Sequence, residues 1–270
     1  MRRALGPNPS RGSPTLSAMR LIPDDAPAVP AAPDLPRRTL LEEVGVVLAL
    51  SVLPSAVYAI RSLLRAPVSG VVVAAANQAA DFLDQLLPFV FGLAPVWLVV
   101  HLARRSGEGM GSFGFDGDRA RRDATDGLLL FMVVGAAGAG IYLAAVGLGV
   151  NRFVIPAPPA GYWWTWLAVL MNAAGAALLE ETVVLAYLVT RLQQLGWSAW
   201  AAIAASAVLR GSYHLYQGWG GFLGNVAMGL LFGVLFVRWR RAWPFVVAHL
   251  LLDVGAAAAF LWFGDRLPGF

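Results

Sequence analysis

The sequence contains no cysteine and no lysine, and only 13% of its 270 residues are charged. The missing cysteine excludes disulfide bonds, thiolate metal sites and a cysteine nucleophile. Soluble domains carry roughly 25% charged residues, and a soluble core cannot absorb this much apolar surface. Because the chain is 58% hydrophobic with a mean hydropathy of +0.65, its composition predicts a protein that crosses a membrane several times.

Apolar runs long enough to cross about 30 Å of hydrocarbon predict an all-α fold, a polytopic bundle of transmembrane helices. Seven such runs cover residues 44–60, 85–103, 124–149, 162–190, 197–216, 219–237 and 242–263. The stretch 66–83 is interrupted by Asn77, Gln78 and Asp81, and we interpret it as a re-entrant or interfacial segment. If it also crosses the membrane, the count is eight.

The net charge of +4 comes entirely from arginine, and the arginines follow the positive-inside rule if the N-terminus is cytoplasmic. In this orientation seven spans leave only four arginines on the outer side, namely Arg61, Arg65, Arg152 and Arg266. Arginines beside spans are explained by orientation and by anionic lipid headgroups, so we expect a lipid bilayer as partner and no nucleic acid. The alanine, arginine and glycine bias without lysine suggests a bacterial, multi-pass protein of the cell membrane.

Polar breaks divide the chain into three parts. Residues 1–38 are rich in Pro, Ser and Arg and are predicted to be a disordered cytoplasmic tail. Residues 39–121 hold the first transmembrane helices and most of a cytoplasmic loop at 104–123, and residues 122–263 form the second membrane domain. In that domain Gly229 and Gly233 form a GxxxG pattern, which is typical of closely packed helices.

Two adjacent carboxylates, Glu180 and Glu181, are the only charges between Arg152 and Arg191. A charge at the centre of a bilayer costs about 2.5 kcal/mol or more, so ionisable groups inside spans are functional candidates by default. Consecutive residues lie about 100° apart around an α-helix, and both side chains cannot point at one spot. We therefore expect one glutamate to face a site and the other to brace it.

The other charged residues and histidines of the last four spans occur in pairs four positions apart. Arg210 and His214 form one pair, and His249 and Asp253 form the other. Residues four apart share a helix face. If these faces converge with Glu180, the C-terminal four helices enclose a polar site assembled from three of them.

Three short motifs give the second membrane domain a resemblance to a known family. They read EETVVL at 180–185, RGSYH at 210–214 and HLLLD at 249–253. In order and separation they resemble the EExxxR, FxxxH and HxxxN/D motifs of the CPBP intramembrane proteases, which include the CAAX prenyl endopeptidases and the bacterial Abi proteins. Leu185 stands where the family has arginine, and Arg210 stands where it has phenylalanine. We expect Arg210 to replace the missing arginine and to pair with Glu181 or Glu180.

The resemblance implies a membrane-embedded endopeptidase that acts on a membrane-associated peptide or protein. Glu180 would activate a water molecule, and His214 would assist its orientation or proton transfer. His249 and Asp253 would stabilise the oxyanion or complete the polar shell. Peptide hydrolysis needs a base, an oxyanion donor and an acid, and glutamate with histidine supplies all three.

Two alternatives remain open at this point. No cofactor is expected, but two histidines with carboxylates are also a plausible zinc set, although the HExxH motif is absent. The same buried Glu/His cluster could also serve a protein that is not a protease, either a degenerate family member or a proton-coupled transporter.

Overall fold

The computed structural model describes residue 22 and residues 27–63, 78–148 and 161–263, and within these ranges every regular element is a helix. The predicted all-α, polytopic fold is therefore confirmed. Most of the predicted tail at 1–38 and most of the 66–83 stretch lie outside the described residues.

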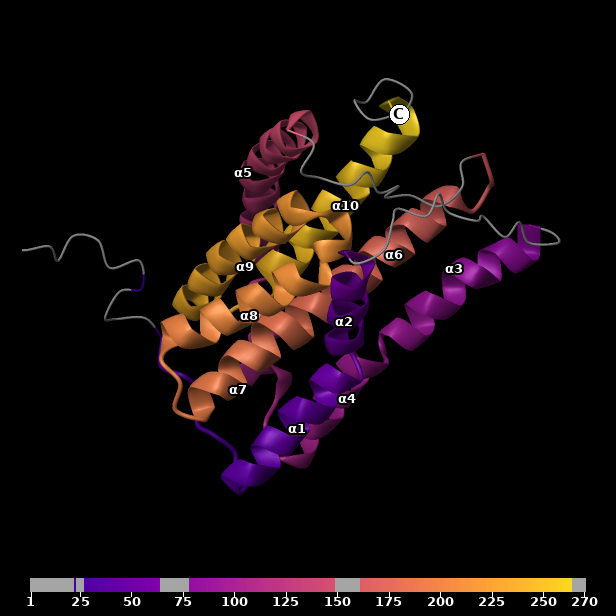
Figure 1. The fold of residues 1–270 in the computed structure, drawn as a ribbon. Helices are drawn as coiled ribbons and strands as arrows, with labels where there is room; N and C mark the ends of the chain where they lie inside the picture. Colours follow the sequence, from indigo (N-terminus) through magenta and orange to yellow (C-terminus); the bar gives the residue numbers. More distant parts are fainter. Residues whose placement is uncertain (1–21, 23–26, 64–77, 149–160, 264–270) are drawn as a thin grey trace, which may run out of the picture.

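The helices follow one another as α1 (Arg37–Ala49), α2 (Val52–Leu63), α3 (Gln78–Gly92), α4 (Ala94–Arg105), η2 (Met110–Phe113), α5 (Ala120–Gly147), α6 (Thr165–Leu179), η3 (Glu180–Tyr187), α7 (Leu188–Gln194), α8 (Ala199–Tyr213), η4 (Leu215–Gln217), α9 (Trp219–Trp239) and α10 (Trp243–Phe263) (Figure 1).

Five helical segments in the described ranges are long and apolar enough to span a membrane, and a sixth is added if α1 and α2 count as one bent span. The five are Asp81–Arg105, Ala120–Ile141, Thr165–Gln194, Trp219–Trp239 and Trp243–Phe263. The predicted count of seven is compatible with this result but not confirmed by it. The run at 197–216 forms α8, which has only 15 residues, whereas a full crossing takes about 20.

The run at 44–60 is not one straight helix, because α1 and α2 meet at an angle of 51°. Pro54 explains the break. Its ring clashes with the carbonyl group four residues earlier, that of Leu50, and its nitrogen has no proton to donate to it. The helix is interrupted at Leu50 and Ser51, where the Ser51 hydroxyl donates a hydrogen bond to the carbonyl oxygen of Val47 (2.5 Å).

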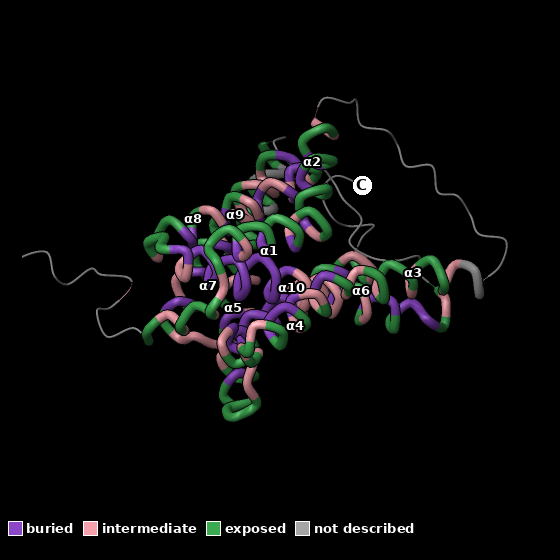
Figure 2. The backbone as a smooth tube through the Cα atoms, turned by 90° about the horizontal axis from the view of Figure 1, so that it is seen from below, coloured by how far each residue is buried: buried purple, intermediate pink, exposed green. Residues whose placement is uncertain are grey.

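The last helices form the closely packed part of the molecule. A Cβ atom added at Gly229 would lie 2.9 Å from Cα of Ala207, and one at Gly233 would lie 2.6 Å from a side-chain carbon of Ile203. The GxxxG pattern of α9 thus brings α8 into backbone contact, as predicted. Helix α10 packs between α5 and α6, while α2 lies against α8 and η4. Figure 2 shows that buried residues concentrate in this region and that α3 is mostly exposed or half-buried.

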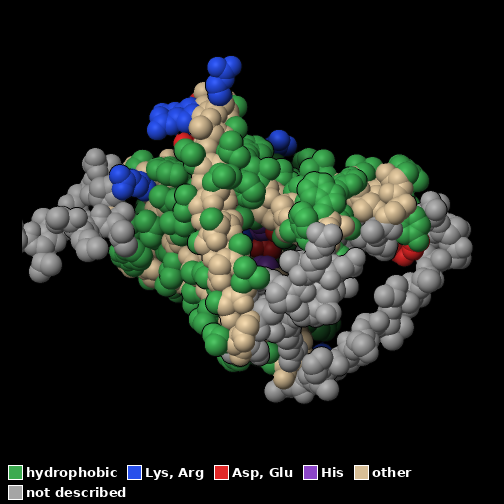
Figure 3. Space-filling model, turned by 90° about the horizontal axis from the view of Figure 1, so that it is seen from above, with side chains coloured by type: hydrophobic (Ala, Val, Ile, Leu, Met, Phe, Trp, Pro, Cys, Tyr) green, Lys and Arg blue, Asp and Glu red, His purple; other side chains and the backbone are tan. Residues whose placement is uncertain are grey.

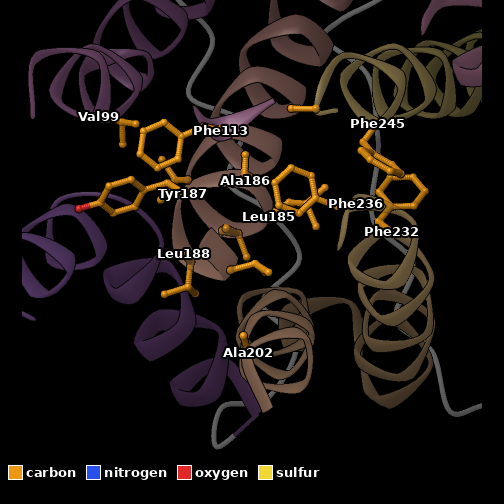
Figure 4. Close-up of a cluster of buried hydrophobic side chains, with 14 of the residues drawn as sticks. Val99, Phe113, Leu185, Ala186, Tyr187, Leu188, Ala202, Phe232, Phe236 and Phe245 are labelled. Atoms are coloured by element: carbon orange, nitrogen blue, oxygen red, sulfur yellow. The ribbon is translucent and has the colours of Figure 1, made fainter. Parts of the chain in front are cut away.

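The core surrounds the segment η3, where every residue is buried. Side chains from α4, η2, α8, α9 and α10 converge on it, including Val99, Phe113, Ala202, Phe232 and Phe245 (Figure 4). The centre of the bundle is therefore apolar on the side of η3 that carries Leu185 and Tyr187.

One end of the bundle is tied together by arginine pairs. Arg105 at the end of α4 pairs with Glu43 of α1, and the fully buried Arg191 of α7 donates hydrogen bonds to both carboxylate oxygens of Glu108 (3.0 and 2.6 Å). Arg241, between α9 and α10, donates two hydrogen bonds to Asp123 of α5 (2.5 Å each). These hydrogen bonds from the guanidinium to Asp123 raise the pKa of Arg241. The predicted concentration of arginine at one end of the spans thus has a structural role.

Candidate active site

The two glutamates open a stretch of π-helix. Glu180–Tyr187 interrupts the helix that begins as α6 and ends as α7. The π-helix is rare, and short π segments inside α-helices occur frequently at functional sites. Its wide turn is supported from outside, because the buried Ser206 of α8 donates a hydrogen bond to the carbonyl oxygen of Val184 (2.6 Å).

Glu181 is the inner glutamate, with no exposed surface. Its Oε1 lies 2.8 Å from Nη1 of Arg210 in α8 and 2.8 Å from Nδ1 of His249 in α10. Buried ionised groups are tolerated when they are paired and hydrogen-bonded. Glu181 is therefore held by two helices at once, which is the position expected of a brace.

Glu180 is the outer glutamate and keeps 12% of its side chain exposed. Its Oε2 accepts a hydrogen bond from the hydroxyl of Tyr213 (2.8 Å) and lies 3.3 Å from Nη2 of Arg210. The Nε2 atom of His214 is 3.7 Å from the same oxygen. This distance is too long for a direct hydrogen bond, but one water molecule could contact both groups.

His249 connects the buried carboxylate to a more accessible one. Its Nε2 lies 3.5 Å from Oδ2 of Asp253, whose side chain is 42% exposed. Nδ1 is close to both Glu181 (2.8 Å) and Arg210 (3.2 Å). Nδ1 cannot donate to a carboxylate and accept from a guanidinium at the same time. The shorter contact with the carboxylate makes Nδ1 a donor to Glu181, and the approach of Arg210 is then a contact without a hydrogen bond.

His214 is the site residue whose ring is least engaged. Neither Nδ1 nor Nε2 has a hydrogen-bond partner among the described residues, although both atoms are buried. The ring lies between those of Tyr213 (4.8 Å between centroids) and Tyr216 (6.1 Å). Figure 3 shows acidic and histidine atoms at the bottom of an opening in the face that it presents. Both ring nitrogens of His214 thus have unused hydrogen-bonding capacity among the described residues.

The expected pairing of Arg210 with the glutamates is present, and it involves both of them. Leu185 instead lies in the buried apolar core (Figure 4). The structure therefore brings together every predicted site residue: Glu180, Glu181, Arg210, His214, His249 and Asp253.

Two residues that support the site were not identified from the sequence. Tyr213 directly precedes His214, and its hydroxyl reaches Glu180, but a tyrosine at the end of an apolar span is ordinarily assigned to the membrane interface. Ser206 lies four residues before Arg210, on the same helix face, and this spacing could have identified it.

A ligand set for a metal is not found in the described part of the chain, where no group of three or more His, Asp or Glu side chains is arranged to hold an ion. The guanidinium of Arg210 instead lies among Glu180, Glu181 and His249, at the point where their donor atoms meet. The donor atoms of these three side chains thus lie around the guanidinium of Arg210, a cation that the protein itself supplies.

The C-terminal part of the chain matches the model of a known protein family. Residues 162–255 match the family model described as type II CAAX prenyl endopeptidase Rce1-like. This segment is similar to the CAAX protease family. All predicted site residues lie inside it, whereas α1 to α5 lie outside it. The search of curated proteins and the search of solved structures each found no match. Together with its apolar helices, the family match indicates a multi-pass membrane protein with a segment similar to a protease family.

Proposed function

We propose that the protein is an intramembrane endopeptidase that hydrolyses peptide bonds of a membrane-associated protein or peptide with a water molecule activated by Glu180. The observation that carries the proposal is that Nε2 of His214 lies 3.7 Å from Oε2 of Glu180, so that one water molecule beside them could contact both groups. Both groups also keep part of their surface exposed, whereas Glu181 and Arg210 do not.

The reaction follows from this arrangement. Glu180 accepts a proton from water as the water oxygen attacks the carbonyl carbon of the scissile peptide. The carbonyl oxygen then carries the negative charge, which His214 stabilises by donating a hydrogen bond. The proton returns from Glu180 to the amide nitrogen, the carbon–nitrogen bond breaks, and a carboxyl group and an amine are released.

The other residues hold the base in position. Tyr213 and Arg210 both contact Oε2 of Glu180, so the second oxygen, Oε1, is the one left for the water proton. Glu181 fixes Arg210 by ion pairing. Of the two roles expected of His249, the geometry supports completion of the polar shell, since its two ring nitrogens face Glu181 and Asp253 and it is a further support of Glu181.

The test compares two glutamates of the same chain in purified protein reconstituted in lipid, using a peptide library as substrate. Glu180→Gln should lower the cleavage rate by a factor of about 10² to 10⁴, the usual contribution of a general base. Glu42→Gln is the matched control, because Glu42 is exposed on α1, where it pairs with the exposed Arg38. Equal cleavage by wild type and Glu180→Gln would contradict the proposal.

The same assay with a chelator separates the two hydrolytic mechanisms. Activation of water by Glu180 predicts unchanged cleavage after chelation. Loss of cleavage that added Zn²⁺ restores would instead support the metal-dependent mechanism.

A function without proteolysis is favoured by one observation. Arg210 contacts both carboxylates, and the ionisable contacts continue from Glu180 through Glu181 and His249 to the more exposed Asp253. Such chains also carry protons across membranes. If wild type cleaves nothing in the library, and proteoliposomes take up protons in a way that Glu180→Gln abolishes, this second function replaces the first.

A further inference from the structure

A cavity of about 290 Å³ lies between α2 and the segment that joins α8 to α9. The described residues that line it are Ser55, Tyr58 and Ala59 of α2 together with Tyr213 and Tyr216. Because α2 packs directly on α8 and η4, the two sides of the cavity belong to neighbouring elements.

The side chain of Tyr213 connects the cavity to Glu180, the predicted base. Tyr213 lines it with its own surface and donates its hydroxyl proton to Oε2 of Glu180 (2.8 Å). The rings of Tyr213 and Tyr216 also flank His214. A peptide bond held against Glu180 and His214 would therefore place a neighbouring part of the substrate in the cavity.

The lining indicates what the cavity accepts. Three tyrosine rings offer flat apolar surfaces with a hydroxyl at the edge, and such surfaces suit apolar or aromatic groups that carry some polar atoms nearby. No charged side chain belongs to the described lining, so a charged group would lose its hydration without gaining a partner. The volume is near the lower end of the roughly 300–1,000 Å³ that ligand sites occupy, which suits one side chain with its peptide groups.

We propose that this cavity is the substrate subsite for an uncharged, apolar or aromatic side chain next to the scissile bond, and that α2 is its specificity-determining wall. The inference rests on the proposed endopeptidase function. It assigns substrate selection to a helix outside the family segment at 162–255, whereas the hydrolytic residues lie inside that segment.

The test fills the cavity from the α2 side without touching the predicted catalytic residues. Ser55 is exposed, so Ser55→Trp adds a large side chain without displacing the core. Val57→Trp is the matched control, because Val57 is 49% exposed on the same helix and does not line the cavity. The substrates are peptides that differ at one position, with glycine, alanine, phenylalanine or aspartate next to the scissile bond.

Wild type should cleave the phenylalanine peptide best and the aspartate peptide worst. Ser55→Trp should lower kcat/KM for the phenylalanine peptide at least tenfold and leave the glycine peptide nearly unchanged, while Val57→Trp should behave as wild type. Tyr58→Ala widens the same cavity and should shift the preference toward larger side chains. The same preference in wild type and in all three variants would overturn the subsite.

Direct binding separates failure of the subsite from failure of the proposed function. The peptides are titrated against Glu180→Gln and against the double variant Glu180→Gln/Ser55→Trp. If wild type cleaves none of the peptides, and Ser55→Trp still selectively weakens binding of the phenylalanine peptide, the cavity is a binding site. Only the endopeptidase function is then contradicted. If the peptides do not bind, or bind both variants equally, the subsite is overturned.

Discussion

Substitution of Arg210 by leucine should be among the most destabilising single changes in the bundle. Arg210 is 2% exposed, and its guanidinium lies 2.8 Å from Glu181 and 3.3 Å from Glu180. Removing one partner of a buried ion pair costs about 3–5 kcal/mol, because the other charge is left without compensation. Here two carboxylates lose their common cation, so Arg210→Leu should lower the free energy of unfolding by about 5 kcal/mol, the upper end of that range.

The structure also predicts a second substitution that restores part of the lost stability. Glu181 has no exposed surface, whereas Glu180 retains its hydrogen bond from Tyr213 and some exposure. The double variant Arg210→Leu/Glu181→Leu removes the charge that is hardest to leave unpaired. It should therefore be more stable than the sum of the two single variants predicts, with a coupling energy of about 2 kcal/mol or more.

Equilibrium unfolding of the purified variants in detergent micelles, followed by loss of helical circular dichroism, measures these differences. Arg38→Leu is the control, because it breaks an exposed pair with Glu42 and such pairs contribute about 0–1 kcal/mol. A free energy of unfolding for Arg210→Leu within about 1 kcal/mol of wild type would refute the ion-pair argument. Strict additivity in the double variant would refute the predicted relief.

Three further changes test other contacts. Tyr213→Phe removes a hydrogen bond to the Glu180 carboxylate worth about 1.5–3 kcal/mol, so kcat should fall roughly 10- to 100-fold with little change in KM, as steady-state kinetics would show. Ser206→Ala leaves the carbonyl oxygen of Val184 without its partner from α8 and should lower the free energy of unfolding by about 1–3 kcal/mol. Burial acts to raise the pKa of the Asp116 carboxyl, but the hydrogen bonds that it accepts hold its pKa below the ordinary value. Its stabilising effect is therefore present above about pH 4 and is lost on further acidification, so Asp116→Asn should show a weaker loss of stability between pH 5 and pH 3 than wild type.

For each of these three substitutions, one result would contradict the prediction. A rise in KM with kcat unchanged would show that Tyr213 serves binding and does not position the base. An unchanged unfolding transition in Ser206→Ala would mean that the wide turn does not depend on α8. Equal acid sensitivity of Asp116→Asn and wild type would remove that carboxyl from the pH dependence.

The convergence of the site residues could be predicted from the sequence, because the positions of the charged residues within the apolar runs were sufficient to indicate it. Glu180, Arg210 and His249 each lie in an apolar run, and charges there avoid lipid by facing one another. Helical periodicity then added His214 and Asp253 to the same faces. The exchange of Leu185 and Arg210 relative to the family motifs also correctly predicted which cation pairs with the glutamates.

Other features were not predictable by the same reasoning. The support that Tyr213 and Ser206 give depends on how α8 rotates against η3, and helical periodicity alone does not fix that rotation. The roles of the two nitrogens of His249 likewise depend on tertiary distances. The break between α1 and α2, by contrast, has a visible signal in Pro54, and hydropathy counting passed over it because proline does not interrupt an apolar average.

The π segment has a consequence for how this chain tolerates changes in length. Hydrogen bonds from residue i to i+5 place one more residue in a turn than an α-helix does, so such a turn is equivalent to an insertion of a single residue. Deleting one residue between Thr182 and Tyr187 would return the segment to α-helical spacing while Ser206 and the neighbouring helices keep their positions. The parts of the helix before and after such a deletion would roughly keep their mutual orientation, and only the wide turn would be lost. A deletion in the α-helical stretch of α6 has no extra residue to remove, so it would turn Glu180 and Glu181 by about 100° relative to the preceding part of α6.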